Sequence, residues 1–302
     1  MYDTLVLSGG GVNGILELGS LQYCNDKCLL SNIKTYVGTS IGSIICYLLI
    51  IGYTPVEIIV YLCTHNKLFE KIKVMDISAG CRGDGATSFL HIIEYLENMT
   101  TDKIGKILTM KDIPKLFNKQ FICTTFNVSK NITEYLSAET NPDLPCLSAL
   151  RMSANIPFMF ENYKYGDSFY VDGGICDNFP LGVAESSGDN VLGIVIVLPK
   201  DIEIDPNFYP QKNLLSYSLR LLTVSLEETT NLRIKNKKES THIITLTAPN
   251  HYNSIKFSID SKSKLDMFSQ GYNQTTCCLN IPGTPITDIV DDKVVEEDTS
   301  HI

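Results

Sequence analysis

The chain has 302 residues, of which 44% are hydrophobic and 20% are charged, and its formal net charge is −9 at pH 7. These values are typical of a globular protein with a substantial core, and the length fits one large α/β domain or two small ones. The negative charge argues against nucleic acid as a partner and against general electrostatic docking on anionic membranes.

The ten cysteines predict a reducing environment. They include no C-x-x-C pair, and none stands at zinc-ligand spacing with a histidine, so we expect buried, reduced thiols and no metal site. The first residues lead directly into a strand-like run without the features of a signal peptide, and the longest apolar stretch, 41–51, is too short to span a bilayer. We therefore expect an intracellular, cytoplasmic protein.

The chain begins with a strand pattern at 4–7, a glycine loop at 8–14 and a helix pattern at 15–21. The loop could bind a dinucleotide through its G-x-G-x-x-G pattern, offer backbone N–H groups to a developing oxyanion, or be only a tight turn. A Walker loop is excluded because no Gly-Lys-Ser/Thr follows. The glycines of the loop are Gly9, Gly10, Gly11 and Gly14.

A second strand, 33–37, and an apolar helix, 41–51, flank the sequence Gly38-Thr39-Ser40-Ile41-Gly42. G-x-S-x-G between a strand and a helix is typical of a nucleophile elbow, which exposes the serine hydroxyl at the carboxyl edge of the sheet. Gly38 and Gly42 suit this turn because a side chain at either position would collide with the neighbouring strand or helix. By itself the motif also fits a Gly/Ser turn that feeds a core helix.

The position of Ser40 helps to distinguish the alternatives for the first loop. A dinucleotide fingerprint requires an acidic residue at the end of the second strand, about 20 residues on. Thr39 and Ser40 stand at that place instead. A nucleophile there favours the oxyanion role for the glycine loop.

The rest of the chain alternates between strand and helix patterns and shows no internal repeat. Thr54, Pro55 and Glu57 provide the N-cap, first position and capping box of a helix that we expect to reach about residue 71. The acidic stretch 281–302 predicts a disordered tail after a domain at 1–280. Between them we expect a Gly-rich loop at 80–85, a helix at 87–98, a helical piece at 110–117 interrupted by Pro114, a hairpin of strands 120–126 and 133–137, a turn at 141–145, a helix at 147–154, a strand at 169–171, a helix from 178–181 onward, a doubly buried strand at 191–198, a helix at 213–238, a strand at 242–247 and a helix at 262–279.

A serine nucleophile needs a group that takes its proton, and histidine is the usual one. None of the five histidines falls at the carboxyl edge of a predicted strand, and His251, after a Pro-Asn turn, is the best of them. Asp172 does end a strand, and Gly173 and Gly174 let the backbone turn sharply after it, although Asp-Gly-Gly alone also fits a plain turn. Since a parallel sheet brings its strand ends to one edge, we predict that Asp172 meets Ser40 and deprotonates it directly.

Three blocks in this order resemble the signature of the patatin-like phospholipase family: Gly9 to Gly14, Gly38 to Gly42, and Asp172-Gly173-Gly174. The segments 149–157 and Gly271-Tyr272 are also similar to family features, and the resemblance covers about residues 3–279. It implies a three-layer α/β/α fold with a central, mostly parallel sheet and the nucleophile elbow after the second strand. It also implies that no metal or other cofactor is needed.

The same resemblance implies a lipid acyl hydrolase of the phospholipase A or lysophospholipase type. Ser40 would attack the ester carbonyl of a phospholipid or another acyl-ester lipid, and Asp172 would take its proton. An acyl-serine intermediate would form and would then be hydrolysed by water. The oxyanion would be held by N–H groups from the residues Gly9, Gly10, Gly11, Gly14 and Ile41.

One residue departs from the family pattern, which usually carries Arg or Lys where this chain has Asn13. The catalytic groups remain, so we still expect activity, while the headgroup preference stays open. Two other functions also stay open: a general carboxylesterase for soluble or neutral-lipid esters, and a non-catalytic lipid- or nucleotide-binding module. Transient contact with a membrane surface could use a hydrophobic rim or an activating protein partner.

Overall fold

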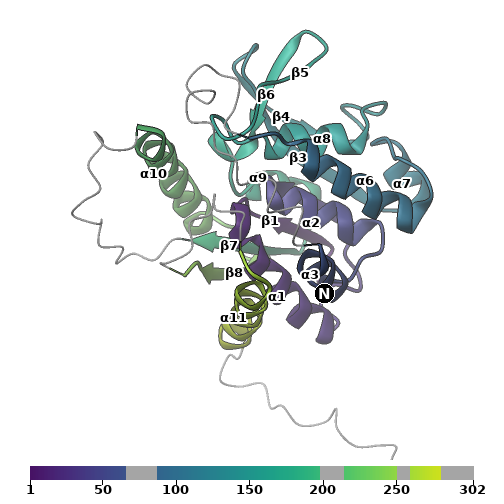
Figure 1. Ribbon diagram of the computed structural model, residues 1–302. Helices are drawn as coiled ribbons and strands as arrows, with labels where there is room; N and C mark the ends of the chain where they lie inside the picture. Colours follow the sequence, from purple (N-terminus) through teal and green to yellow (C-terminus); the bar gives the residue numbers. More distant parts are fainter. Residues whose placement is uncertain (66–86, 198–213, 250–258, 280–302) are drawn as a thin grey trace, which may run out of the picture.

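The computed structural model describes residues 1–65, 87–197, 214–249 and 259–279, and for 214–223 and 225 it describes the backbone alone. Figure 1 shows the helices and strands. The strands are β1 (Thr4–Leu7), β2 (Thr35–Thr39), β3 (Gln120–Asn127), β4 (Ile132–Leu136), β5 (Tyr163–Tyr165), β6 (Ser168–Asp172), β7 (Val191–Val197) and β8 (His242–Thr247). The helices are α1 (Gly14–Asp26), α2 (Ile41–Ile50), α3 (Pro55–Thr64), α6 (Leu90–Ile104), α7 (Asp112–Phe117), α8 (Cys146–Ala154), α9 (Leu181–Ser187), α10 (Leu214–Lys235) and α11 (Ser261–Leu279), with short 3₁₀ turns η1 (Gly11–Asn13) and η2 (Gly173–Ile175).

The described strands form one sheet in the order β5-β6-β3-β2-β1-β7-β8, and β4 pairs with β3 beside this path. Neighbouring strands run parallel from β3 through β2, β1 and β7 to β8. The pairs β3–β4, β3–β6 and β5–β6 are antiparallel. The first strand of the chain therefore lies inside the parallel part, between β2 and β7.

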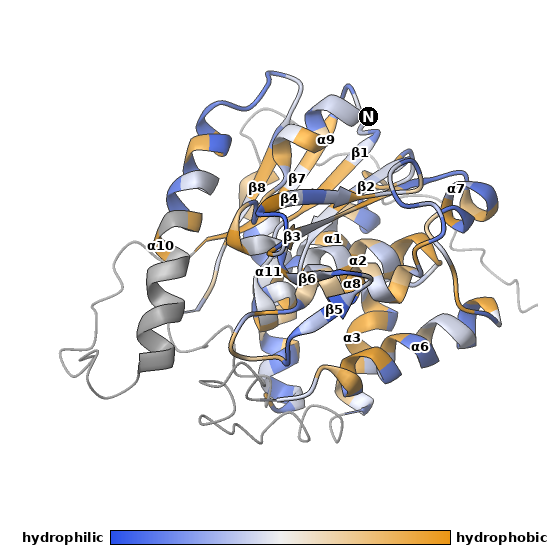
Figure 2. Cartoon of the chain, turned by 90° about the horizontal axis from the view of Figure 1, so that it is seen from above, coloured by the Kyte–Doolittle hydropathy of each residue, from blue (hydrophilic) through white to orange (hydrophobic). Residues whose placement is uncertain are grey.

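Helices cover both faces of the sheet, and the side chains of β1 alternate between the two cores. Leu5 and Leu7 belong to the larger core, which includes residues of α1, α2, α3, α6, α8 and α11. Val6 faces the smaller core, where Phe179 and Leu181 bring in α9, and α10 packs against its edge. Figure 2 shows the apolar strands between these two sets of helices. The expected three-layer fold with a mostly parallel sheet is confirmed.

The start of α3 matches the expected capping box. The hydroxyl of Thr54 accepts the N–H of Glu57 at 3.2 Å, and the Glu57 carboxylate accepts the N–H of Thr54 at 2.7 Å. α3 ends at Thr64. The expected extension to residue 71, the Gly-rich loop at 80–85 and the tail at 281–302 lie outside the described residues.

The structure differs from the sequence predictions in several local details, including α6, which spans Leu90–Ile104 where a helix was expected at 87–98. β2 spans Thr35–Thr39, later than expected, because its pairing partners in β3 begin at Gln120. Pro114 does not interrupt α7, since it falls in the first turn, where a missing N–H removes no hydrogen bond. β5 was not expected, because three residues are too few to show an alternating pattern.

Among the described residues, no helix by itself is both long and apolar enough to cross a membrane, and α2 and α3 reach that length and composition only as a pair bent by 116°.

Candidate active site

Ser40 occupies a strained turn between β2 and α2. Its φ of 55° and ψ of −125° are sparsely populated by L-residues, at a cost on the order of 1–3 kcal/mol. A Cβ on Gly38 would lie 2.6 Å from the backbone of Gly42, and a Cβ on Gly42 would lie 2.5 Å from the oxygen of Ser8. Both glycines are needed because the start of α2 passes so close to the strands.

Asp172 lies beside Ser40, although 132 residues separate them in the sequence. Ser40 Oγ donates a hydrogen bond to Asp172 Oδ2 at 2.5 Å, and the N–H of Gly174 donates to Oδ1 at 2.7 Å. Burial raises the pKa of Asp172 to about 6, although both hydrogen bonds favour the charged form. The carboxylate is therefore suited to accept a proton near neutral pH.

The strand that carries Asp172 reaches this position from the direction opposite to the one expected. β6 runs antiparallel to β3, so Asp172 is not at the carboxyl end of a parallel strand. β3 continues past Thr124, the partner of Thr39, and its next residue, Thr125, pairs with Asp172. β6 thus runs back along this overhang and ends beside Ser40. The residue was placed correctly at the edge, but the reason given for it was wrong.

The two glycines after Asp172 fit a tight corner. A Cβ on Gly173 would overlap the backbone oxygen of Thr124, so β3 leaves no room for a side chain there. A Cβ on Gly174 would lie 2.9 Å from Asp172 Oδ1, the same oxygen that accepts the N–H of Gly174. This close approach lets the backbone donate to the carboxylate.

The glycine loop offers unpaired N–H groups next to Ser40. Gly11 is left-handed, with a φ of 55°, and Ile41 is the first residue of α2, whose N–H has no partner within the helix. No acceptor in the described part of the chain takes the N–H of Gly10, Gly11 or Ile41. These are the donors an oxyanion would need.

The N–H groups of two other glycines in the predicted oxyanion group already have hydrogen-bond acceptors. The N–H of Gly9 donates to the backbone oxygen of Asn178 at 2.9 Å, and the N–H of Gly14 is bonded within η1. A Cβ on Gly9 would lie 3.2 Å from the Cβ of Ser40, and a Cβ on Gly14 would lie 2.5 Å from the Ile41 side chain. Gly9 and Gly14 thus allow close packing and are not N–H donors for an oxyanion.

Asn13, where the family usually has a basic residue, is buried in this loop. It is 2% exposed, and its N–H donates to the oxygen of Gly10 at 3.1 Å. Its Oδ1 has no hydrogen-bond partner among the described residues. A neutral side chain suits this place because it needs no counter-ion.

Two further residues hold the site from α8 and the segment after it. The hydroxyl of Ser153 accepts the N–H of Ser40 at 2.9 Å, and the backbone oxygen of Asn155 accepts the N–H of Asp172 at 2.9 Å. In the sequence, the segment 149–157 stands out only through its resemblance to a family block. A lone serine on a helix gives no pattern by which its contact with Ser40 could be found.

None of the described histidines contacts Ser40 or Asp172. His65 lies against Tyr61, His91 against Glu94, and His242 against the ring of Tyr2, while His251 and His301 lie outside the described residues. In the described ranges, no three His, Cys, Asp or Glu side chains gather closely enough to hold a metal ion.

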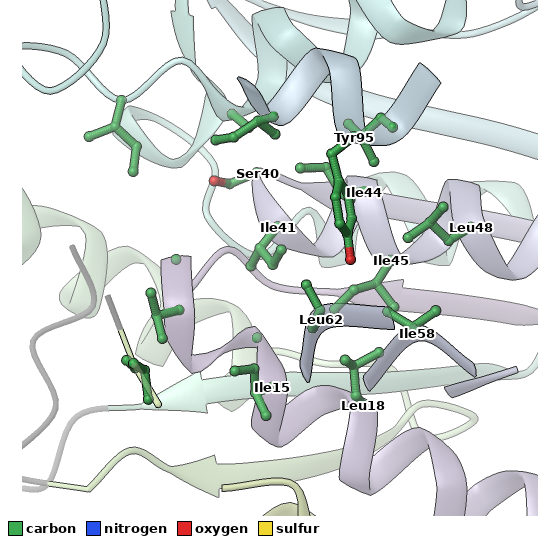
Figure 3. A pocket seen from close by; sticks show the side chains of 18 of the residues that line it. Ile15, Leu18, Ser40, Ile41, Ile44, Ile45, Leu48, Ile58, Leu62 and Tyr95 are labelled. Atoms are coloured by element: carbon green, nitrogen blue, oxygen red, sulfur yellow. The ribbon is translucent and has the colours of Figure 1, made fainter. Parts of the chain in front are cut away.

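An apolar pocket of about 120 Å³ opens beside Ser40. Figure 3 shows Ser40 at one side of it and Ile41, Ile44 and Leu48 following one another along α2. The rest of the wall comes from the glycine loop, α1, α3, α6, the segment after α8 and the start of α11, and it is aliphatic or aromatic except for the glycines and Lys264. The pocket is therefore suited to a hydrocarbon chain.

A mostly parallel sheet between helical layers, with a serine on the strained turn after its second strand, defines a class of α/β proteins that carry a nucleophile on such an elbow. The chain belongs to the patatin-like phospholipase family, whose sequence model matches residues 5–185. That range contains Ser40, Asp172 and both glycine loops. The resemblance noted in the sequence is confirmed.

Two viral proteins are among the relatives. Over 185 residues the chain is 38% identical to the probable lipid hydrolase 463L of Invertebrate iridescent virus 6, a match that covers 61% of this chain and 63% of that protein. Over 279 residues it is 25% identical to the uncharacterized protein R571 of Acanthamoeba polyphaga mimivirus, covering 88% and 90% of the two chains. The match to the first relative thus leaves more than a third of that protein's length unmatched.

Two solved structures share the fold. VipD from Legionella pneumophila is 18% identical with a TM-score of 0.55, and the likeness covers 92% of this chain and 66% of VipD. The type III effector ExoU is 15% identical with a TM-score of 0.50, and the likeness covers 92% of this chain and 52% of ExoU. This chain therefore corresponds to a part of each of those proteins.

Proposed function

We propose that this chain is a lipid acyl hydrolase of the phospholipase A or lysophospholipase type. The observation that carries the proposal is the 2.5 Å hydrogen bond between Ser40 and Asp172 at the mouth of an apolar pocket. Membership of the patatin-like phospholipase family and the name of the iridescent virus relative, a probable lipid hydrolase, support it.

In the proposed reaction, Asp172 takes the proton of Ser40 as the serine oxygen attacks the ester carbonyl. The N–H groups of Gly10, Gly11 and Ile41 stabilise the oxyanion of the tetrahedral intermediate, and loss of one such donor typically raises the barrier by roughly 3 kcal/mol. The protonated Asp172 then gives its proton to the leaving alcohol. The acyl group stays on Ser40 until a water molecule, deprotonated by Asp172, releases the fatty acid.

The pocket favours a long acyl chain over a short one. Each methylene that leaves water for an apolar wall contributes about 0.8 kcal/mol. A short soluble ester gains little of this energy, so the carboxylesterase alternative makes less use of the pocket. Contact with a membrane surface is part of the proposal, because a phospholipid substrate resides in one.

The test is the release of fatty acid from phosphatidylcholine vesicles by the wild type, Ser40→Ala and Asp172→Asn. We expect release by the wild type and a loss of at least about a thousandfold in each variant. Ser269→Ala, an exposed serine on α11, is the matched control and should retain full activity.

Other outcomes separate the alternatives. Hydrolysis of short soluble esters without phospholipid hydrolysis would favour a general carboxylesterase. If a fluorophosphonate probe never labels Ser40, the chain is a binding module. Equal fatty-acid release by the wild type and Ser40→Ala would refute the proposal.

A further inference from the structure

Asp177 connects two of the three blocks that form the candidate site. Its N–H donates to the oxygen of Gly173 at 2.9 Å, which fixes the turn after Asp172. Its own backbone oxygen accepts the hydroxyl of Thr39 at 2.9 Å, directly before Ser40. One peptide segment therefore sets the distance between the strand end that carries the serine and the loop that carries the aspartate.

The next residue, Asn178, connects the same segment to the third block. Its backbone oxygen accepts the N–H of Gly9 at 2.9 Å, and its side-chain Nδ2 donates to the oxygen of Gly9 at 3.2 Å. These two hydrogen bonds clamp the peptide units on both sides of Gly9. The pair Asp177-Asn178 thus touches the glycine loop, the elbow and the Asp172 loop together.

The carboxylate of Asp177 is buried, and it does not contact Ser40. Its side chain is 2% exposed, and its Oδ2 accepts the hydroxyl of Tyr135 at 2.7 Å and lies 3.0 Å from Arg233 Nη2. A buried carboxylate is expensive unless it is paired, and removing one partner of such a pair is strongly destabilising locally. Arg233 is thus the charged partner of this buried carboxylate, beside the hydroxyl of Tyr135.

Arg233 comes from α10, in a region that the family match does not reach. The match ends at residue 185, and α10 spans Leu214–Lys235 on the face of the sheet covered by α9. A helix outside the matched range therefore supplies the counter-charge for the segment on which all three blocks depend.

We infer that Asp177 is a positioning residue for the Ser40–Asp172 pair and that Arg233 of α10 holds it in place. Loss of the ion pair releases the Asp177-Asn178 segment, so Asp172 and the glycine loop shift relative to Ser40. A shift of about 1 Å at a catalytic pair can cost up to about a hundredfold in rate. The kinetic part of this inference rests on the proposed function, and the exchange measurement below does not.

The kinetic test uses a soluble ester, with Arg233→Met, Arg233→Lys, Asp177→Asn and the double variant Asp177→Asn/Arg233→Met. We expect kcat to fall between about tenfold and a hundredfold in Arg233→Met and Asp177→Asn, with KM changed less than about twofold. Arg233→Lys should recover part of the rate, and the double variant should lose less than the product of the single losses. Lys235→Met, an exposed residue of the same helix, is the control for charge and should resemble the wild type.

Amide hydrogen exchange tests the same inference without turnover. In Arg233→Met the peptides covering 172–178 and 8–14 should exchange at least about tenfold faster than in Lys235→Met, while those of β7 stay unchanged. If Arg233→Met does not fold, Asp177→Asn takes its place with the same expected exchange, because it removes the charge that Arg233 contacts and keeps the shape of the side chain.

Failure of the proposed function and failure of this inference would give different results. A wild type without Ser40-dependent turnover would refute the proposed function, and the exchange data would then decide the present inference alone. Unchanged exchange at 172–178, or a kcat of Arg233→Met within twofold of that of Lys235→Met, would overturn it. The inference would also be overturned if the lower rate of Arg233→Met were fully explained by a smaller fraction of folded protein.

Discussion

Gly19 of α1 and Gly271 of α11 lie where the two helices touch backbone to backbone. A Cβ on Gly19 would overlap the backbone oxygen of Phe268, and a Cβ on Gly271 would overlap that of Leu16. Since α1 begins directly after the glycine loop, this contact also fixes the helix from which the loop extends. The close packing links the last described helix to the first.

Gly271→Ala should therefore destabilise the protein by about 1–3 kcal/mol or more, because the added methyl group forces the helices apart. Urea unfolding measures the change. Gly105→Ala is the control, since its Cβ would meet nothing within 4 Å. It should lower the free energy of unfolding by only roughly 1 kcal/mol, because an alanine is less stable than a glycine in the left-handed conformation. Equal losses in the two variants would contradict the proposed packing.

The rate of ester hydrolysis should depend on the ionisation of Asp172. Its pKa is about 6, and only the carboxylate can accept the proton of Ser40. We expect kcat/KM for a soluble ester to be constant above pH 7 and to fall about tenfold per pH unit well below pH 6. A rate that stays constant down to pH 4.5 would show that Asp172 is not the base.

The same carboxyl group should make the protein less stable as the pH rises, although the rate of hydrolysis rises over the same pH range. Below pH 3.8 both the folded and the unfolded chain hold the proton, and between pH 3.8 and about 6 only the folded chain does. The free energy of unfolding therefore falls as the pH rises through this window, by about 3 kcal/mol in total. Asp172→Asn removes this loss, so its stability relative to the wild type should rise between pH 4 and pH 7. Urea unfolding of both proteins across this pH range measures the difference, and a constant difference would contradict the raised pKa of Asp172.

Ser153→Ala should leave the buried N–H of Ser40 without an acceptor. The expected cost is about 1–3 kcal/mol in the free energy of unfolding, together with a lower kcat, because the elbow loses one of its anchors. Ser148→Ala, on the same helix, should change the free energy of unfolding by no more than about 0.5 kcal/mol and should leave kcat unchanged. Indistinguishable values for the two variants would remove Ser153 from the site.

Leu48→Trp should shorten the acyl chain that the pocket accepts. Leu48 lies two helical turns beyond Ile41, about 10 Å further from Ser40 along α2. Hydrolysis of palmitoyl esters should fall at least about tenfold while that of butyryl esters stays within about twofold, because only the long chain reaches this wall. Val60→Trp, on the exposed side of α3, controls for the added ring. An equal loss for both chain lengths would argue against the pocket as the acyl site.

Local patterns were enough to predict most of the framework. β1 and β8 have the predicted bounds, and the cap at Thr54 forms as predicted, since strand alternation and capping depend on neighbours in the sequence. Ser40 and Asp172 were recognisable because glycines stand on both sides of Ser40 and directly after Asp172, where a tight turn requires them. The oxyanion group was predicted too broadly, because the sequence does not show that the N–H of Gly9 is already bonded to Asn178.

What could not be predicted depends on pairing between distant segments. The direction of β6 follows from its place beside β3, and a short strand pattern contains no information on direction. The contacts of Ser153 and Arg233 likewise join residues far apart in the chain. An isolated serine or arginine on a helix does not differ in the sequence from one that faces solvent.

The place of β1 inside the sheet has a consequence for protein synthesis. Thr4 of β1 pairs with Thr35 of β2 on one side and with Val191 of β7 on the other, so one edge of the first strand stays open until β7 has been made. Arg233 and α11 emerge later still. A growing chain therefore contains both Ser40 and Asp172 before β7, Arg233 and α11 have been made. The sheet around β1, the strand that leads into the glycine loop, is therefore completed only after the family-matched residues 5–185 have been made.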